Sequence, residues 1–477
     1  MKRYLLVVSI ALSSTLSAQS FEEQFRAFQR QAAKSYTDFR DEANQKYANF
    51  LRGAWEYYQQ APVIPQPKEE PMPPVVYNDE QKQEEEQIPV EVVPTPAPTP
   101  EPKPIAPIEE NTQPSNVVTI VYQGTSFAFR CPSHKLVLNH TDGESLAKAW
   151  EDISTAEYDN LLYDCWQNKE NFHLCDWAYF ELIGELSHYL HKSDNEATFL
   201  QAFILAQTGY AMRLAKNQNG KLFVLVGSEY QLYDKGYFDI DGINFYPLVQ
   251  PQDGLQICSG GFDKEQPFTL DINPEQGLKV KNSTMNARKS DMNVTASCTI
   301  NLNTIQFYNS YPTGQVNGDC GTRWATYANA PMEECVRQSL YPTLKQAIRG
   351  VPEAQAVNKL LNWVQTAFEY EYDDKVWGGD RAFFPSESLY YPYCDCEDRS
   401  ILFSRIVRDL LNLDVVLLYY PGHLATAVAF HQDVKGDYVL LNGTKYIVCD
   451  PTYIGAPIGM TMPDMDNKTA KVIKLNK

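Results

Sequence analysis

The sequence has no long run of basic residues, and acidic side chains outnumber basic ones. Its 477 residues carry 60 Asp and Glu against 41 Lys and Arg, which gives a formal net charge of −19. Nucleic acids and anionic membrane surfaces are both bound through basic faces. The composition therefore argues against nucleic acid as a partner and gives no support to a role at an anionic membrane surface.

Long apolar stretches are also scarce. The apolar run at residues 4–12 follows Lys2 and Arg3 and precedes small residues up to Ala18. This order is typical of a secretory signal peptide, and the run is too short to span a bilayer. We expect cleavage near Ala18, export to the periplasm or the extracellular space, and no integral membrane segment. No cysteine lies at the expected cleavage site, so we expect no lipid anchor there.

Cysteine occurs at ten positions, which in an exported protein favours some disulfides. Cys165 with Cys175 and Cys320 with Cys335 are plausible local pairs, although connectivity does not follow from sequence. If one of the ten cysteines is a free nucleophile, nine remain and at least one of these is also unpaired.

The amino-terminal quarter divides into two segments. Residues 19–60 carry aromatic side chains at near-helical spacing, which predicts an amphipathic helix. This helix either packs on its own protein or another helix, or docks on an envelope partner through residues 21–60. Residues 61–116 are rich in Pro and Glu and bury too little apolar surface to fold alone. We expect a linker there, extended and partly in the polyproline II conformation.

The remaining chain predicts an α+β protein with several domains. Residues 117–254 combine apolar strands with helical patterns and form an α+β domain. Residues 255–340 show short alternating stretches, which predict a β-rich connector. Helical spacing begins again near Tyr341 and leads into a carboxy-terminal domain at 341–477.

Chemistry concentrates in that last domain. Cys396 directly precedes apolar residues at spacings of three and four: Ile401, Leu402, Ile406, Val407, Leu410 and Leu411. The pattern predicts a helix that begins near Cys396. The free N–H groups and the dipole of a helix N-terminus favour an anion, so Cys396 is expected in a place that promotes a thiolate.

Two further residues complete a candidate catalytic set. His423 opens a predicted strand after Pro421-Gly422, and Asp450 ends another strand beyond the hairpin signal Asn442-Gly443. Adjacent strands lie about 4.8 Å apart, so His423 and Asp450 can be neighbours. A thiolate that attacks a carbonyl, an imidazole that moves the proton and a carboxylate that orients the imidazole form a triad. Each residue alone also has a structural explanation, as a buried or bridged thiol, a turn histidine and a strand cap.

These motifs resemble those of a known group of enzymes. The stretches Asp395-Cys-Glu-Asp-Arg-Ser-Ile-Leu402, Gly422-His423 and Cys449-Asp-Pro-Thr-Tyr453 are similar to those of the transglutaminase-like superfamily, a branch of the papain-like cysteine enzymes, in its exported bacterial members. The resemblance covers roughly 340–477. It implies a papain-like domain in which the Cys396 helix packs on an antiparallel sheet that bears His423 and Asp450. It also implies that Cys396 is the nucleophile, His423 the general base and Asp450 the orienting acid, without a cofactor.

The chain departs from the family pattern at Cys394, where the family often has Gly. Cys394 either forms a disulfide that controls access to the site or remains a free thiol. The backbone N–H of Cys396 is a natural oxyanion donor, and Trp377 or Tyr391 is a candidate side-chain donor. Farther upstream, residues 195–226 follow a similar helix-then-strands order without the cysteine, which indicates either a degenerate second copy or an unrelated α+β domain.

Three functions remain in competition. The first is a thiol-dependent enzyme that cleaves amide bonds of proteins or peptides, favoured over amine-accepting cross-linking because water is always present as an acceptor. The second is a non-catalytic envelope binding or scaffold protein, which the linker and the aromatic helix favour. The third is a zinc site built from Cys394, Cys396, His423 and Cys449, which the Cys-x-Cys spacing disfavours, so we expect no metal.

Overall fold

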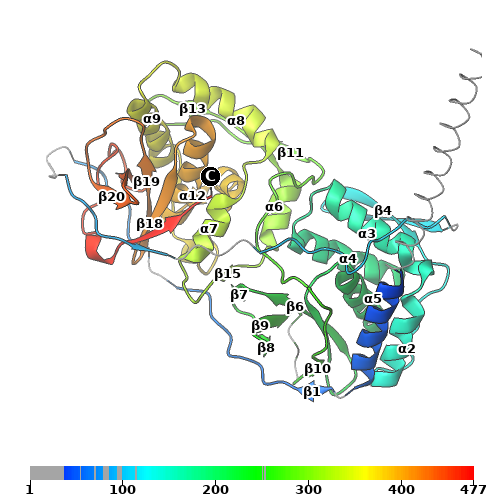
Figure 1. Ribbon diagram of the computed structural model, residues 1–477. Helices are drawn as coiled ribbons and strands as arrows, with labels where there is room; N and C mark the ends of the chain where they lie inside the picture. Colours follow the sequence, from blue (N-terminus) through cyan, green and yellow to red (C-terminus); the bar gives the residue numbers. More distant parts are fainter. Residues whose placement is uncertain are drawn as a thin grey trace, which may run out of the picture.

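The computed structural model describes residues 37–53, 55–68, 71–78, 85–93, 99–112, 115–249, 251 and 254–476. Helices and mainly antiparallel sheets make up two lobes, which confirms the α+β class (Figure 1). The amino lobe contains a helix over 37–52 and residues 115–281, and the carboxy lobe contains residues 282–476. Within the described ranges, no helix is long and apolar enough to cross a membrane. The expected signal peptide lies outside the described residues.

In the amino lobe, a β-hairpin and four labelled helices accompany a six-stranded sheet in the order β1-β10-β5-β6-β9-β8. Its elements are β1 (Glu56–Tyr57), β3 (Asn116–Tyr122), β4 (Thr125–Cys131), α2 (Gly143–Ile153), η1 (Ala156–Tyr158), α3 (Asp159–Asn171), α4 (Asp176–Leu190), α5 (Asp194–Gln207), β5 (Met212–Lys216), β6 (Leu222–Ser228), β7 (Gln231–Leu232), β8 (Phe238–Ile240), β9 (Ile243–Pro247) and β10 (Gln256–Cys258).

In the carboxy lobe, helices pack on a second six-stranded sheet in the order β2-β22-β18-β19-β21-β20. Its elements are β2 (Glu91–Val92), β11 (Asn282–Thr284), β12 (Arg288–Lys289), β13 (Thr295–Ala296), β14 (Thr299–Asn301), α6 (Leu302–Asn309), β15 (Gly314–Gln315), α7 (Thr322–Asn329), α8 (Glu334–Ala347), α9 (Glu353–Thr366), β16 (Glu369–Tyr370), α10 (Asp373–Val376), α11 (Pro385–Tyr390), β17 (Tyr393–Cys394), α12 (Cys396–Leu411), β18 (Val415–Tyr420), β19 (His423–Ala429), β20 (Tyr438–Leu441), β21 (Thr444–Cys449), η2 (Asn467–Thr469) and β22 (Lys471–Lys474).

Local sequence explains the boundaries of the carboxy lobe. The helix α12 begins at Cys396, as the apolar spacing predicts, and ends at Asn412, whose φ of 54° is the left-handed conformation that Asn tolerates. The hairpin β20–β21 turns through Asn442 and Gly443, which have φ values of 50° and 83°. Positive φ at both positions is typical of a two-residue type I′ turn, whose twist matches the strands it joins.

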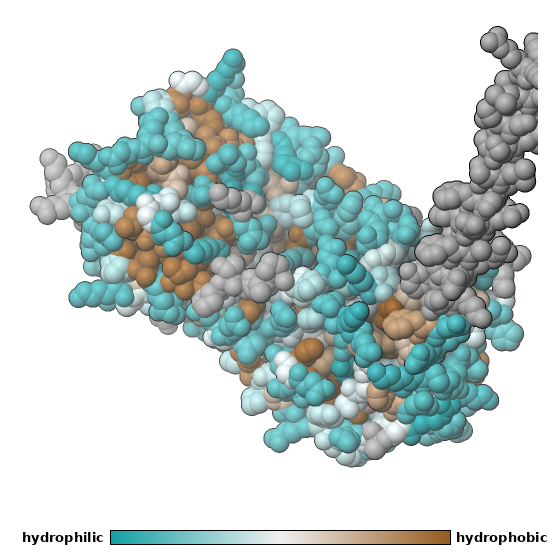
Figure 2. Space-filling view, viewed as in Figure 1, coloured by the Kyte–Doolittle hydropathy of each residue, from teal (hydrophilic) through white to brown (hydrophobic). Residues whose placement is uncertain are grey.

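Apolar packing joins the two lobes. One buried cluster runs from the helices of the amino lobe through Tyr308 of α6 and Trp324 of α7 to Cys396 of α12. A second cluster fills the space between α8, α9 and the opposite side of α12. Figure 2 shows a mostly hydrophilic outer face, with several brown patches over the carboxy lobe.

The Pro- and Glu-rich segment follows both lobes in extended form (Figure 1). Ala61 and Ile64 bridge to the amino lobe, whereas β2 pairs with β22 of the carboxy lobe. Ile88 and Val93 are buried. The described residues of this segment are extended, as predicted, and they pack on the edges of both lobes rather than running free as a linker. The segment needs no core of its own because it borrows the edges of two sheets.

Other boundaries also differ from the predictions. The helix over 37–52 ends near Gly53, and the predicted extension to residue 60 is instead the strand β1. Tyr47 and Leu51 of this helix are buried in the amino-lobe core, as expected for a helix that packs on its own protein. The expected β-rich connector contains the helices α6 and α7, and α8 begins at Glu334, ahead of Tyr341. The helices α6 and α7 have eight residues each. Helices this short are marginal in water, so tertiary packing decides their form.

The predicted local disulfides are wrong. All ten cysteines lie in the described part of the chain, and Cys165, Cys175 and Cys335 carry free thiols. Neither the Cys165–Cys175 nor the Cys320–Cys335 pair is therefore formed. Cys165 and Cys175 pack in the amino-lobe core as small apolar side chains.

Candidate active site

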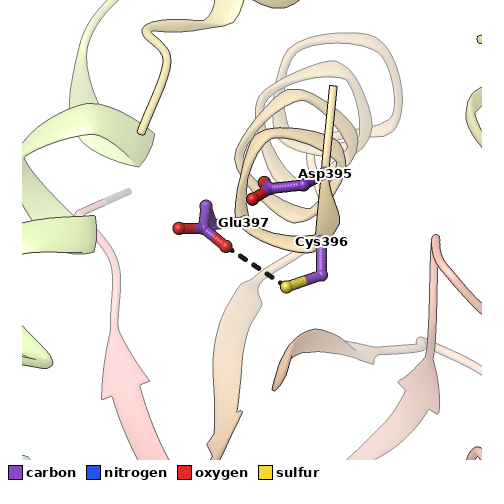
Figure 3. Close-up of side chains that lie close together, drawn as sticks. All are labelled: Asp395, Cys396 and Glu397. Carbon is purple, nitrogen blue, oxygen red and sulfur yellow. Dashed lines mark hydrogen bonds between the residues drawn. The ribbon is translucent and has the colours of Figure 1, made fainter. Parts of the chain in front are cut away.

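Cys396 is the first residue of α12 and is 2% exposed. Its Sγ donates a hydrogen bond to Glu397 Oε2 at 3.2 Å (Figure 3). The helix start is fixed by Asp398 Oδ2, which accepts the backbone N–H of Asp395 at 3.3 Å. The sequence therefore places a thiol and two carboxyl groups together on the first turn of one helix.

His423 and Asp450 meet on neighbouring strands. Tyr420 of β18 pairs with His423 across a Pro-Gly turn in which Gly422 has a φ of 76°, so His423 is the first residue of β19. Its Nε2 lies 2.8 Å from Asp450 Oδ2, and both side chains are buried. Asp450 Oδ1 accepts the backbone N–H groups of Thr452 and Tyr453, which fixes the carboxylate. His423 Nδ1 is buried without a hydrogen-bond partner among the described residues.

Buried polar side chains connect the helices, strand and loop that carry Cys396, His423 and Asp450. Gln365 of α9 donates its side-chain amide to the carbonyl groups of Asp450, Tyr453 and Ala456 at 2.9, 2.8 and 3.1 Å. The Ser400 hydroxyl of α12 donates to the Leu424 carbonyl of β19 at 2.7 Å. The loop after β21, the strand β19 and the helix α12 are thus tied together by groups that sequence patterns do not reveal. Gln365 lies far from Asp450 in the chain and belongs to no motif.

Cys396 and His423 line one cavity of about 360 Å³. The lining of this cavity also includes Asp373, Asp380 and Glu397, whose carboxyl oxygens lie within 4.8 Å of one another. Burial, followed by the charge of Glu397, raises the pKa of Asp373 to about 8 and that of Asp380 to about 7. Arg323 offsets part of this charge, since its Nη2 lies 2.9 Å from Asp380 Oδ2. The cavity thus combines a thiol, an imidazole and a carboxyl-rich wall.

The electrostatics around Cys396 differ from the sequence prediction. Burial raises the pKa of the Cys396 thiol well above its ordinary value, and the carboxyl groups of Glu397 and Asp395 raise it further. These surroundings favour the neutral thiol, whereas the helix N-terminus alone would promote a thiolate. The dipole of α12 is outweighed because desolvation and neighbouring carboxylates both disfavour a charged sulfur.

The two candidate side-chain donors for the oxyanion lie outside the Cys396 cavity. Trp377 and Tyr391 pack on Arg381 with ring contacts to one another at 4.8 Å, and neither lines the Cys396 cavity. Trp324 does line this cavity, and its indole N–H is buried without a partner in the described structure. Sequence reasoning missed Trp324 because it lies on α7, far ahead of the cysteine motif and within the predicted connector.

Cys394 points away from Cys396. Its thiol contacts the Glu369 carbonyl at 3.7 Å, and its side chain belongs to the core beneath α8 and α9, whereas Cys396 belongs to the other cluster. Both carry free thiols. The alternative in which Cys394 is a free thiol is therefore the one that the structure has.

The four residues considered as zinc ligands do not form a group in the described structure. Across the described residues, two groups have ligand atoms within 4.8 Å of one another: Asp395, Cys396 and Glu397, and Asp373, Asp380 and Glu397. Neither group includes Cys394, His423 or Cys449. The second group offers the oxygen ligands that suit a hard divalent cation rather than zinc.

Comparison of the chain with protein-family models, with curated proteins and with solved structures finds no match.

Proposed function

We propose that the chain is an exported thiol-dependent enzyme that acts on amide bonds of proteins or peptides through an acyl-thioester on Cys396. The observation that carries this proposal is the 2.8 Å contact between His423 Nε2 and Asp450 Oδ2 beside a cavity that Cys396 lines. With Nε2–H donating to the carboxylate, the lone pair of Nδ1 is the one left to accept a proton. This arrangement agrees with what the resemblance to the transglutaminase-like superfamily implies.

The reaction begins from a neutral thiol. His423 Nδ1 takes the proton of the Cys396 thiol as Sγ attacks the carbonyl carbon, and the Asp450 carboxylate stabilises the imidazolium. His423 then gives this proton to the nitrogen of the leaving amine, and the acyl group stays on sulfur. Water, deprotonated by His423, attacks the thioester and releases the acid and the thiol. An amine in place of water would give a new amide instead.

The negative charge that develops on the carbonyl oxygen needs donors. The backbone N–H of Cys396 is one, and the candidate for a second is the indole N–H of Trp324, which has no partner in the described structure and belongs to a residue that lines the same cavity. Donors fixed in a water-poor site stabilise an oxyanion more than they would in water. Hydrolysis is favoured over transfer to an amine, since water needs no binding site of its own.

A direct test is the capture of the acyl-enzyme. The full chain and Cys396→Ala are incubated with a peptide pool, quenched in acid and analysed by mass spectrometry. We expect a mass increment on the peptide that contains Cys396 in the unaltered chain only, and the added mass identifies the acyl donor. The absence of any adduct, under conditions in which iodoacetamide alkylates Cys396, overturns the proposal.

A second candidate is a non-catalytic binding or scaffold protein of the envelope. The deep burial of Cys396 and the hydrogen bond that ties its thiol to Glu397 favour this alternative. In that case peptides would bind without acylating Cys396, and Cys396→Ala would bind them with the same affinity.

A further inference from the structure

The described residues 64–68 and 71–78, here named the strap, border the cavity that Cys396 lines. Lys68 and Pro71 line this cavity together with Cys396 and His423. At one end of the strap, Gln66 donates its side-chain amide to the Asp380 carbonyl at 2.6 Å. The start of the strap is therefore attached to Asp380, a residue that lines the cavity.

The strap then forms backbone hydrogen bonds with both catalytic loops. The N–H of Met72 donates to the carbonyl of Gly422, the residue before His423, at 2.9 Å. The N–H of Tyr77 donates to the Ile454 carbonyl at 2.9 Å, and the N–H of Ile454 donates to the Val75 carbonyl at 2.8 Å. Ile454 lies just beyond Asp450. An extended segment of the chain's own sequence thus pairs with the two loops that carry the imidazole and the carboxylate.

Side chains strengthen this placement. The rings of Tyr77 and Tyr453 meet edge to face at 5.5 Å, and Met72 packs against the small cluster of Tyr453, Ala456 and Met462. The Tyr370 hydroxyl donates to the Met72 carbonyl at 3.3 Å. Beneath this cover, Cys396 and His423 are each 2% exposed.

We propose that the strap occupies the groove in which an extended peptide substrate binds, and that substrate must displace it. Pairing of an extended chain with free backbone groups is a general way to recognise peptides, because main-chain bonds give affinity for any extended sequence. Selectivity comes from the side chains. Lys68 lines the same cavity as Asp373 and Asp374, so the substrate carries a basic side chain where the strap carries Lys68. This inference rests on the proposed function and adds its substrate class and its regulation.

Covalent attachment explains why the strap outcompetes a free peptide. A tethered segment acts at an effective concentration in the millimolar range for short links, so a peptide of similar affinity binds only when the strap is weakened. A partner or a cleavage that releases the strap would therefore activate the enzyme.

The first experiment weakens the strap in the full-length protein. Met72→Pro with Tyr77→Pro removes the two N–H donors while extended backbone remains allowed. Val76→Pro is the matched control, because Val76 is 73% exposed and neither of the two strap N–H bonds uses its N–H group. We expect alkylation of Cys396 by iodoacetamide to be about tenfold faster or more in the double variant, given roughly 1 kcal/mol for each bond. Equal rates in the double variant, the control and the unaltered chain overturn the inference.

The second experiment returns the strap as a free peptide. A synthetic peptide with the sequence of residues 64–78, added to the double variant, slows alkylation of Cys396 in a saturable manner, and the same peptide with Lys68→Glu protects less. If neither peptide protects Cys396, the strap does not occupy a peptide-binding groove. If both protect equally, the site has no preference for a basic side chain at the position of Lys68. Capture of the acyl-enzyme is measured on the same variant. Faster alkylation without any acyl adduct contradicts the proposed function alone, whereas an acyl adduct with unchanged alkylation contradicts the strap alone.

Discussion

The two six-stranded sheets of this molecule have the same plan, yet only one carries the candidate chemistry. In the amino lobe, α5 precedes strands arranged as β10-β5-β6-β9-β8, and in the carboxy lobe α12 precedes strands arranged as β22-β18-β19-β21-β20. Each helix packs on the first two strands that follow it. The order in the chain and the order in the sheet agree strand by strand. This agreement favours the interpretation of the amino lobe as a second copy over that of an unrelated domain.

The register makes the comparison specific. Lys216 pairs with Leu222 at the start of β6, as Tyr420 pairs with His423 at the start of β19. Similarly, Leu225 pairs with Pro247, as Thr426 pairs with Cys449. Leu222 and Leu248 therefore stand where His423 and Asp450 stand.

The amino lobe has a cavity at the position that corresponds to the Cys396 cavity. Asp194, the first residue of α5, lines a cavity of about 680 Å³ together with Leu222 and Leu248. The fold thus forms a cavity between the helix start and two strand ends whether or not a triad is present. A thiol, an imidazole and a carboxylate at three positions are what distinguish the carboxy-lobe cavity.

The largest expected effect comes from removal of the imidazole. His423→Gln eliminates the proton acceptor, and we expect acylation of Cys396 to slow by about 10²–10⁴-fold, the range for a general base. Leu222→Met at the matching place in the amino lobe conserves volume and should leave acylation unchanged. Single-turnover kinetics with the captured peptide measure both. An equal loss in the two variants would show that the chemistry is not confined to the carboxy lobe.

The next effect tests the candidate donor Trp324, which lines the carboxy-lobe cavity. Trp324→Phe keeps the aromatic ring against Tyr419, 4.9 Å away, and removes the indole N–H. We expect kcat of acylation to fall by about 10²-fold with little change in KM, because an oxyanion forms only in the transition state. Tyr327→Phe, on the same helix but outside the Cys396 cavity, is the control. A rise in KM with an unchanged kcat would instead show that Trp324 packs against the substrate.

Sequence patterns predict the local features of this site but not its long-range contacts. The start of α12, the strands β18 and β19 and the Asn442-Gly443 hairpin follow from periodicity and turn chemistry, which are properties of neighbouring residues. Trp324 and the strap escape such reasoning, because each acts through contacts with residues far away in the chain. The neutral thiol that burial favours at Cys396 escapes it for the same reason: the helix N-terminus is visible in the sequence, but burial is not.

A smaller effect should come from the buried amide that supports Asp450. Gln365→Leu leaves three carbonyl groups without their donor, and we expect the free energy of unfolding to fall by about 1–3 kcal/mol. In the amino lobe, Gln201 of α5 donates a single such bond, to the Phe180 carbonyl at 3.1 Å. Gln201→Leu should therefore destabilise less. Urea unfolding of both variants, followed by tryptophan fluorescence, gives the comparison, and an equal loss would remove any special role of Gln365.

The last prediction concerns the charge next to the sulfur. Because burial and then Glu397 raise the pKa of Cys396, its thiolate fraction and its alkylation rate should still be rising at pH 9, without a plateau near neutrality. Glu397→Gln keeps an acceptor for the thiol proton and removes the charge, so the pKa of Cys396 falls and alkylation at pH 8 becomes faster, tenfold for about each unit by which the pKa is lowered.

Cys335 supplies the reference within the same sample. Burial and Glu333 raise the pKa of this partly exposed thiol to about 11, and it lies outside the Cys396 cavity. Its alkylation, measured by mass spectrometry of the same digests, should not respond to Glu397→Gln. If Cys396 also fails to respond, burial and Asp395 raise its pKa without a contribution from Glu397. Desolvation rather than the Glu397 carboxylate would then oppose the effect of the α12 dipole on Cys396. The contact between Cys396 and Glu397 would no longer count among the features that distinguish the two lobes.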